Sequence, residues 1–486
     1  MSAFAPPRGP WVAAAVAVAA LLWLWPAARP QNLMRDFNAF YCAGAAIDRG
    51  ADPYRAEPLG ACERAPRAAA LNRAPANLSV PAPLPPYALA PFALLARLPY
   101  DVAAVVWTLL SALAFAFTIV AMRRLTGVST LALVAAFGLV DGLASLTLGQ
   151  IAPVAIAAIV LAVAHVEAAR DRAAAVAAAL ATIEPHLGLP ACIALFVFRP
   201  KARLPLSLAA ALFAGVSFAL LGAARCIEYV REVLPAHAMA EIVSQKQFSL
   251  TYVLHRAGVA DAPALMLGNV SYVAMVALGI ALAPRLAKRL CAPGLLVAVP
   301  CALAVFGGPF VHVVQLAAAL PAAFLLFARA PQLRTVWAAA IAGLAIPFVQ
   351  FASLGTAFPL FAAAAAAALA HTLFRARPLA SAVAGAATYG FASLAAALVH
   401  ERVPDASRIL ALHYDPAALA QASWDLYVRT VATSNASAFD LAKLPNWLGL
   451  AALVAGAIVL AVPNKVSVAA PREEKENRPL GRIAYR

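Results

Sequence analysis

Long apolar runs with almost no charge recur along this chain, and they decide what it can fold into. An apolar run of about 20 residues crosses a bilayer as a helix, because a helix pairs its own backbone groups where water is absent. The runs, some shorter than a full span, are Trp11 to Ala28, Asp101 to Met122, Val128 to Val140, Ile151 to Val166, Ala173 to Phe198, Leu204 to Ala223, Leu265 to Ala283, Gly294 to Phe306, Val311 to Ala328, Val336 to Ser353, Phe358 to Phe374, Leu379 to Val399 and Trp447 to Val462. They predict an all-α polytopic membrane protein with about 12 to 13 transmembrane segments.

Composition excludes an ordinary soluble enzyme. The 486 residues are 64% hydrophobic and 12% charged, against roughly 45–50% and about 25% in soluble domains. The formal net charge is +15, from 37 Lys and Arg against 22 Asp and Glu. A nucleic-acid site gathers such charge on one face or arm. Here it is spread among short loops, so membrane lipids and not nucleic acid are the expected surroundings.

Those basic loops also predict orientation, since Lys and Arg mark the cytoplasmic side. They are Arg123 with Arg124, Arg170 with Arg172, Arg199 with Lys201 and Arg203, Arg285 with Lys288 and Arg289, Arg329 with Arg334, and Arg375 with Arg377. The short connections near Gly149, Gly307 to Pro309 and Gly355 carry no Lys or Arg. These connections are expected to lie outside. Three long polar stretches, over residues 30–100, 225–264 and 400–446, fall on the same side and are expected to be extracytoplasmic loops.

One run breaks this alternation. Ala173 to Phe198 has basic loops at both ends, and Glu184 and Pro185 stand at its middle. Proline breaks a helix interior. We therefore predict a re-entrant or broken hairpin of two short helices, Ala173 to Ile183 and Leu187 to Phe198, that returns to the cytoplasm.

The organisation predicted is one integral-membrane domain over residues 1–463 and a disordered cytoplasmic tail over 464–486. A cleaved signal peptide up to about Pro30 is an alternative. The stretch containing Pro81, Pro83, Pro85, Pro86 and Pro91 predicts an extended strap and no regular helix. Cys42 and Cys62 share the first long loop and either form a disulfide in an oxidising compartment or stay unpaired. No spacing suggests zinc or haem, so no metal or cofactor is expected.

Asp36 is the first candidate for chemistry, close to the outer end of the first span. A carboxylate there is either a solvated charge or a general base in a cleft between lipid and loop. The aromatic neighbours Phe37, Phe40 and Tyr41 favour the base, because apolar walls make a carboxylate more basic.

The residues around Asp36 resemble glycosyltransferase family 87. The resemblance rests on Asp36-Phe37, Tyr41, Ala45-Ala46, Gly50-Ala51-Asp52-Pro53-Tyr54, Pro85-Pro86-Tyr87 and Pro91-Phe92, followed by Gly149-Gln150, Gln247-Phe248-Ser249-Leu250 and Pro309-Phe310-Val311-His312. It extends to about Leu320. The chain departs from the family pattern at Glu184-Pro185-His186, where Lys-Pro-Gln is common, at Gly308, which replaces a Ser, and in lacking the Trp before His312.

The resemblance implies a GT-C fold in the inner (plasma) membrane with its active site on the extracytoplasmic face. It implies transfer of mannose or another hexose or pentose from a polyprenyl-phosphate donor to a glycolipid, glycan or protein acceptor. Such a displacement needs a base for the acceptor hydroxyl and groups that stabilise the leaving phosphate. A direct displacement with Asp36 as the single base inverts the anomeric centre.

The expected site residues follow from this chemistry. Donor-phosphate binding is expected of Arg35, His186, Lys246, Arg256 and His312, and substrate binding of Tyr41, Gln150, Glu184 and Gln247. The structural alternatives are helix capping for the two glutamines, a mutual hydrogen-bonded pair for Glu184 and His186, and a core histidine for His312. An acceptor or lipid groove is a weaker expectation for Tyr414, Asp415, Trp424 and Tyr427.

Two further functions stay open. A transporter or flippase of a lipid-linked substrate usually has two similar halves with matching broken helices, and the sequence shows a broken segment in the first half alone. A catalytically degenerate family member is favoured by Glu184, an acid at a position where a base is common.

Overall fold

The computed structural model describes residues 34–65, 78–350, 357–398, 413–431 and 436–462. It is about 81% helical, and no strand forms within the described residues. The predicted span Trp11 to Ala28, the signal-peptide alternative and the tail 464–486 lie outside them. The all-α prediction is thereby confirmed.

The described residues form a series of helices. In chain order they are α2 (Arg35–Asp48), α3 (Ala56–Glu63), α5 (Pro86–Leu95), α6 (Tyr100–Thr126), α7 (Thr130–Phe137), η3 (Gly138–Leu143), α8 (Ala144–Leu148), α9 (Ala152–Glu167), α10 (Asp171–Ala181), α11 (Pro185–Phe198), α12 (Pro200–Glu228), η4 (Tyr229–Val233), α13 (Leu234–Glu241), α14 (Leu250–Arg256), α15 (Asp261–Arg289), α16 (Leu295–Gly307), η5 (Val313–Ala319), α17 (Leu320–Arg329), η6 (Pro331–Leu333), α18 (Arg334–Ala345), η7 (Phe348–Gln350), α20 (Phe358–Leu373), α21 (Pro378–Leu398), α23 (Ala420–Val431) and α24 (Ala436–Ala461).

Seven helical runs in the described part of the chain are long and apolar enough to cross a membrane. They are Tyr100–Thr126, Thr130–Leu148, Pro200–Glu241, Asp261–Arg289, Pro331–Gln350, Pro378–Leu398 and Phe439–Ala461. Shorter apolar helices, among them α9, α11, α16 and α20, coincide with other predicted runs. The chain is therefore a multi-pass membrane protein.

The predicted hairpin is present as α10 and α11, which meet at Thr182 to Glu184. Gly188 permits their close approach, because a Cβ at this position would lie 2.4 Å from the backbone carbon of Ala181. Any larger residue would push the two helices apart.

Three segments depart from the predictions. The extended strap is correct for residues 78–85, but Pro86 to Leu95 form helix α5. Pro86 occupies the first turn of α5, where its missing N–H leaves no hydrogen bond unmade and its fixed φ suits a helix. The region expected to be the second long loop is mostly helical, because α12 continues through η4 and α13 to Glu241. Helix α24 begins at Ala436, well before Trp447.

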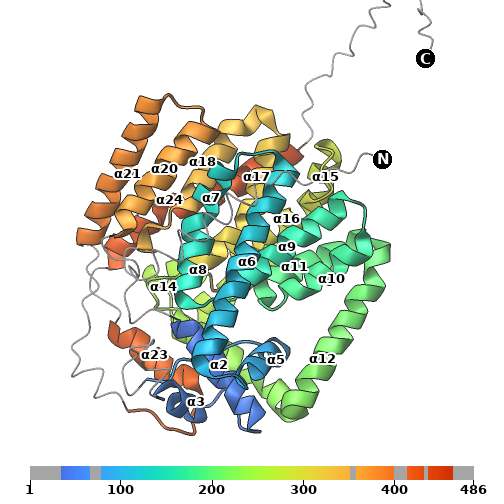
Figure 1. Ribbon diagram of the computed structural model, residues 1–486, viewed down its shortest axis with the longest axis vertical. Coiled ribbons are helices and arrows are strands. Elements are labelled where there is room, and N and C mark those ends of the chain that lie inside the picture. Colours follow the sequence, from blue (N-terminus) through green and yellow to red (C-terminus); the bar gives the residue numbers. More distant parts are fainter. Residues whose placement is uncertain (1–33, 66–77, 351–356, 399–412, 432–435, 463–486) are drawn as a thin grey trace, which may run out of the picture.

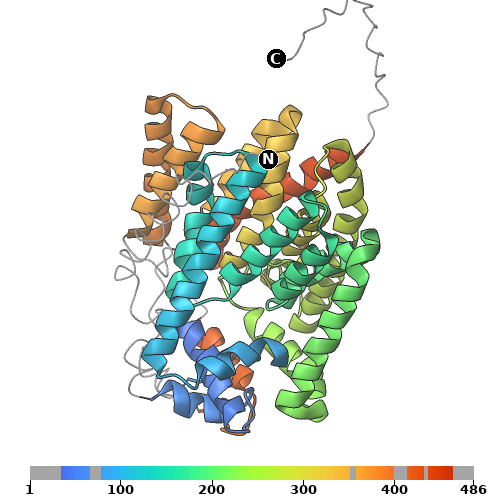
Figure 2. The same ribbon diagram turned by 45° about the vertical axis from the view of Figure 1, so that its right-hand side comes forward.

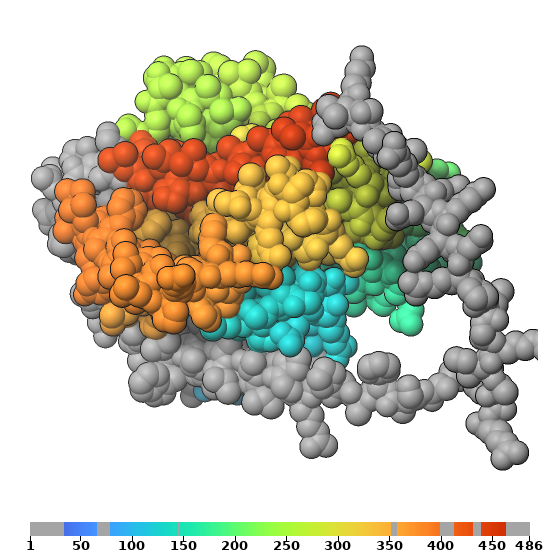
Figure 3. All heavy atoms as spheres, turned by 90° about the horizontal axis from the view of Figure 1, so that it is seen from above, coloured from blue at the N-terminus to red at the C-terminus, as the bar shows by residue number. Residues whose placement is uncertain are grey.

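The elements divide into a membrane bundle and a smaller cap. The cap consists of α2, α3, α5 and α23, which gather at the lower end of the bundle (Figure 1). Their core, with Phe37, Phe92 and Tyr54, includes Tyr229 and Ala420 from far along the chain. Helix α12 forms the outer edge in Figure 2. Seen end-on, α24 lies beside the α17 and α18 segment, and α20 and α21 form one side (Figure 3).

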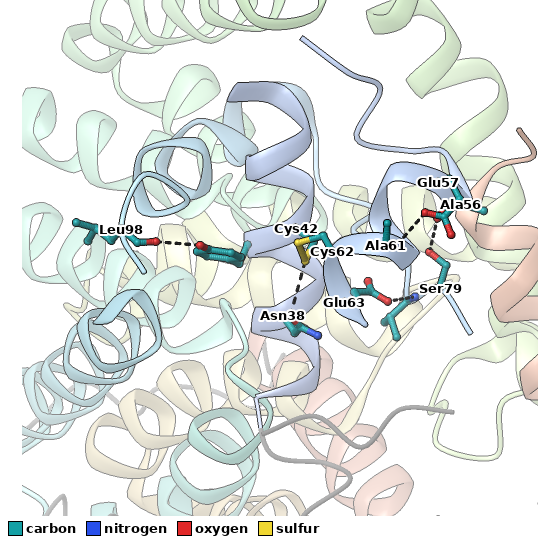
Figure 4. The surroundings of a disulfide bond; sticks show 11 residues. Asn38, Cys42, Ala56, Glu57, Ala61, Cys62, Glu63, Ser79 and Leu98 are labelled. Carbon is teal, nitrogen blue, oxygen red and sulfur yellow. Dashed lines mark hydrogen bonds between the residues drawn. A yellow bond between two sulfur atoms is a disulfide. The ribbon is translucent and has the colours of Figure 1, made fainter. Parts of the chain in front are cut away.

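Helix α2 is fastened to α3 by a Cys42–Cys62 disulfide, which settles the pairing that the sequence left open (Figure 4). The bond closes a loop with a sequence separation of 20 residues. In the chain-entropy account, such a loop stabilises the folded state by about 3 kcal/mol. Its position fixes α2, whose first turn carries Asp36.

We expect the double substitution Cys42→Ala and Cys62→Ala to lower the free energy of unfolding by about 3 kcal/mol. Thermal unfolding in detergent measures the change, and reduction of the parent protein should reproduce it. Cys226→Ala, at a half-buried free cysteine, is the control. An unchanged midpoint for the double variant would contradict the stabilising role.

Glu63, next to the disulfide, gives the cap a pH-dependent stability. Its Oε2 accepts the Val80 N–H at 2.9 Å and the residue is 4% exposed. Burial raises the pKa of the Glu63 carboxyl from 4.5 to about 8. Between these values the folded state holds a proton that the unfolded state has released, so the free energy of unfolding falls as pH rises.

Glu63→Gln should remove this dependence, because the amide keeps an acceptor for Val80 and does not titrate. The expected result is a smaller drop in the unfolding midpoint between pH 5 and pH 8.5 than in the parent protein. Glu57→Gln, on the same helix and partly exposed, serves as the control. Equal slopes for the parent and Glu63→Gln would contradict the raised pKa.

Candidate functional site

A cavity of about 1120 Å³ lies between the cap and the membrane bundle. Its polar lining comes from distant parts of the chain: Arg35, Asp36, Gln150, Glu184, His186, His237, Glu241, Lys246, His312, Gln315, Trp424 and Tyr427. Its apolar lining includes Leu189, Val230, Leu234 and Leu265. The cavity therefore has a charged interior and an apolar side.

Asp36 is held at the cavity wall by the start of α2. The N–H of Met34 donates to Thr147 O at 2.7 Å, which ties this helix end to α8. Gly149 has φ of +72°, and a Cβ there would lie 2.5 Å from Phe37 Cβ. Glycine thus permits the turn that brings Gln150 against α2, where its amide donates to Asp36 Oδ2.

Arg35 completes this side of the cavity. Its Nε lies 3.2 Å from Asp36 Oδ1, and its guanidinium carbon lies 5.5 Å from the Trp424 ring centroid. Burial opposes the charge of Arg35, but Asp36 and other acidic neighbours offset this, and the pKa of Arg35 is raised overall. Asp36 therefore contacts a cation on one carboxylate oxygen and an amide donor on the other.

The hairpin of α10 and α11 supplies a second cluster of polar side chains to the cavity, after that of Arg35, Asp36 and Gln150. Gln315, in η5, donates to Glu184 Oε1 at 2.6 Å, while Glu184 Oε2 is buried without a hydrogen-bond partner. His186 Nε2 lies 3.6 Å from Glu184 Oε1. Glu184 and His186 are therefore neighbours that both line the cavity, but they do not form the mutual hydrogen-bonded pair considered as an alternative, because His186 Nε2 makes no hydrogen bond to a described residue.

A third group is built around Glu241 at the end of α13. Its Oε1 accepts the Trp424 indole N–H at 2.5 Å, and its Oε2 lies 3.3 Å from Gln247 Nε2 and 3.7 Å from His312 Nε2. Gln247 Oε1 accepts the Val311 N–H at 2.7 Å. Glu241 is 4% exposed, so these donors provide the compensation that a buried carboxylate requires.

Phe310 lies among three histidines of the cavity. Its ring centroid is 5.8 Å from that of His186, 5.1 Å from His237 and 4.9 Å from His312, each in an edge-to-face arrangement. The hairpin, α13 and the segment before η5 are thus brought together around one aromatic ring.

The other predicted residues lie in different places. Lys246 lines the cavity. Gln247 is not among the lining residues, and its Nε2 lies 3.2 Å from His312 Nε2. Arg256 is not among the lining residues and pairs with Asp440 at 3.2 Å. Tyr41 also faces elsewhere, since its hydroxyl donates to Leu98 O at 2.9 Å.

Of the third loop, Trp424 and Tyr427 line the cavity. Tyr414 is outside it and accepts a hydrogen bond from Arg64. Asp415 is also absent from the lining and caps the backbone N–H of Ala417.

Sequence reasoning missed His237 and Glu241. They are four residues apart and so share one helix face, a signal that becomes visible once residues 234–241 are known to be helical. It also missed Asp141, which is fully buried in the π-helix η3 and has neither carboxylate oxygen hydrogen-bonded. Within the described residues, no group of three or more His, Cys, Asp or Glu is arranged to hold a metal ion.

Comparison with known proteins agrees with the motifs. Residues 84–309 match the family model described as Glycosyltransferase family 87. This segment contains Gln150, Glu184, His186, Glu241 and Lys246 of the cavity. No curated protein and no solved structure matches the chain. The matched segment, a little under half of the chain, and the membrane helices indicate a membrane glycosyltransferase that is similar to family 87.

Proposed function

We propose that this glycosyltransferase moves a hexose or pentose, mannose being the first candidate, from a polyprenyl-phosphate donor to an acceptor hydroxyl with inversion. The observation that carries the proposal is the composition of the cavity. It holds a carboxylate beside a cation at one end, and it reaches exposed apolar side chains at Val230 and Leu234, which are 62% and 40% exposed.

The chemistry assigns a role to each group. Asp36 takes the proton of the acceptor hydroxyl as that oxygen bonds to the anomeric carbon, and the bond from this carbon to the phosphate oxygen breaks. Arg35, Lys246 and the cavity histidines His186 and His312 stabilise the negative charge that stays on the polyprenyl phosphate. Attack opposite the leaving group inverts the centre.

The family assignment supports transfer over the transporter that the sequence left open. We propose further that residues 1–463 form one GT-C-like domain in the inner membrane and that the cavity faces the extracytoplasmic side. The distribution of charge supports this orientation. Arg123 and Arg124 end α6, whereas Trp107, nearer the other end, donates to Gly149 O beside the cavity. The Cys42–Cys62 disulfide fits an oxidising compartment.

Cysteine labelling in intact cells tests the orientation. In a background without the four free cysteines Cys192, Cys226, Cys291 and Cys301, Lys201→Cys should resist a membrane-impermeant thiol reagent. Arg97→Cys, exposed next to the cap, should react. Reaction at Lys201→Cys before the cells are lysed would reject the proposed orientation and the returning hairpin.

Reconstitution tests the activity. The purified protein in liposomes should consume a radiolabelled polyprenyl-phosphate sugar and deliver the label to an acceptor from the host envelope. Comparison of the anomeric configuration of donor and product by NMR tests inversion. Absence of donor consumption across mannosyl, other hexosyl and pentosyl donors would reject the proposed function.

A further inference from the structure

A buried lysine stands in the first part of α24, outside the cavity. Lys443 is 0% exposed, and its Nζ makes no hydrogen bond to a described residue. It is not among the residues that line the cavity. A buried ammonium ion is costly, and an apolar side chain of similar volume often fills such a place without loss of stability. The charge therefore calls for a role that an apolar side chain could not perform.

Three aromatic rings and one carboxylate enclose the Lys443 ammonium. Its Nζ lies 3.4 Å from the ring centroid of Tyr252, 5.7 Å from that of Trp447 and 5.9 Å from that of Phe248. An aromatic face attracts a cation within about 6 Å of its centroid. Asp440, one turn earlier on α24, places Oδ1 3.7 Å from Nζ. This enclosure, the lysine cage, compensates for the lost water and holds the ammonium in one place.

The lysine cage joins α24 to the segment at the start of α14. Tyr252 belongs to α14 and Phe248 precedes it, whereas Asp440 and Trp447 belong to α24. The Tyr252 hydroxyl donates to Asp440 Oδ1 at 2.7 Å, and the Trp447 indole N–H donates to Phe248 O at 3.1 Å. Residues 247–252 are thereby held against α24 by two hydrogen bonds and by the enclosed cation.

The same segment makes contacts that reach the cavity wall. The Phe248 N–H donates to Val311 O at 2.8 Å, and the Val311 N–H donates to Gln247 Oε1 at 2.7 Å. Gln247 Nε2 lies 3.2 Å from Nε2 of His312, which lines the cavity. A continuous series of contacts therefore leads from α24 to a histidine that is proposed to bind the donor phosphate.

From this series of contacts we infer that Lys443 and Trp447 are positioning residues for the donor phosphate. Trp447 fixes the backbone at Phe248, and the Lys443 cation fixes the ring faces of the lysine cage. Gln247 and His312 thereby keep their places at the cavity wall. An uncharged side chain would fill the same volume without selecting one arrangement of the rings, because the attraction to their faces requires a charge. The inference rests on the proposed function and extends it to residues outside the cavity.

Lys443→Met tests the role of the charge, because methionine is unbranched and adapts to a buried site. Asp440 keeps its hydrogen bonds from Tyr252 and Arg256, so the unfolding midpoint in detergent should not fall. In liposomes with a host-envelope extract as acceptor, KM for the radiolabelled polyprenyl-phosphate sugar should rise about tenfold or more. The kcat should stay within about twofold of the parent value, the pattern expected when binding alone is lost.

Two substitutions on α24 accompany this variant. Lys443→Arg keeps a positive charge and should return KM for the donor to within about threefold of the parent value. Leu444→Met, at a neighbouring residue that is 45% exposed, is the matched control and should leave kcat and KM unchanged. Equal donor KM in Lys443→Met and a folded Lys443→Arg would show that the charge is not what matters, and would overturn the inference.

A double variant tests whether Lys443 acts through His312. His312→Ala alone removes the proposed phosphate contact and should raise KM for the donor. If Lys443 only positions this histidine, the combination of Lys443→Met with His312→Ala should have the KM of His312→Ala alone. Two increases that multiply would mean that the lysine acts elsewhere, contrary to the inference.

Trp447→Phe keeps an aromatic ring beside Lys443 and removes the hydrogen bond to Phe248 O. It should raise KM for the donor, and it decides the question if Lys443→Met does not fold. Parent KM in Trp447→Phe, or in a folded Lys443→Met, would overturn the inference and leave the proposed transferase intact. A parent protein that consumes no donor rejects the proposed function and this inference together.

Discussion

Asp36→Asn is expected to lower the rate of sugar transfer by about 10²- to 10⁴-fold, the contribution of a general base. The amide is nearly the same size and keeps an oxygen that can accept the Gln150 hydrogen bond. Fold and donor binding should therefore survive, because the role proposed for Asp36 is to receive a proton and not to bind the phosphate. The measurement is kcat and KM for the donor, with kcat falling and KM almost unchanged.

Asp48→Asn is the matched control for this substitution. Asp48 ends the same helix α2, where it pairs with Arg97 at 3.0 Å away from the cavity. Its loss should leave transfer within about twofold of the parent rate, as is usual for an exposed ion pair. Transfer by Asp36→Asn close to the parent rate would show that another group takes the proton.

Glu241→Gln is expected to lower kcat/KM by about 10- to 100-fold. The carboxylate interacts with three partners, Trp424, Gln247 and His312. A carboxamide in its place carries no negative charge. Its NH2 group then faces a partner that itself donates, so a hydrogen bond to the carboxylate is lost. One charge-assisted hydrogen bond is worth about 1.5–3 kcal/mol, which corresponds to this range of rate.

The loss in Glu241→Gln should appear mainly as a raised KM for the polyprenyl-phosphate sugar, since its neighbour His312 is proposed to bind the donor phosphate. Glu232→Gln, exposed on the neighbouring η4, is the control and should behave as the parent. A variant with unchanged KM and a destabilised fold would mean that Glu241 serves packing alone. Action of Glu241 through His312 is supported if His312→Ala and the double variant show the same loss as Glu241→Gln.

Much of the bundle could be predicted because its determinants are local. Uncharged runs and basic loops predicted the long helices, and Pro185 between two basic loops predicted the hairpin of α10 and α11. Asp36, Gln150, Glu184, His186, Lys246 and His312 were selected from short motifs or from their place in the membrane, and the fold brings them to one cavity.

The remainder depends on contacts between distant segments. Nothing near Glu184 indicates that its partner is Gln315, 131 residues later. Glu241 was overlooked because the polarity of residues 225–264 was interpreted as a loop, whereas α12 continues to it as helix. Tyr41 was expected at the site from its position beside Asp36, but its place on α2 turns it toward Leu98.

Helix α12 makes the surrounding bilayer a part of this site. The helical run Pro200–Glu241 ends in His237 and Glu241, yet only 17% of its most apolar window is buried within the protein. Lipid therefore supports most of this run, and a helix held by lipid adjusts its tilt to the thickness of the hydrocarbon layer. Gly222, with φ of +75°, interrupts the helix between its lipid-supported length and the cavity. A change in hydrocarbon thickness that tilts α12 is therefore expected to act across this break on the cavity wall that carries His237 and Glu241.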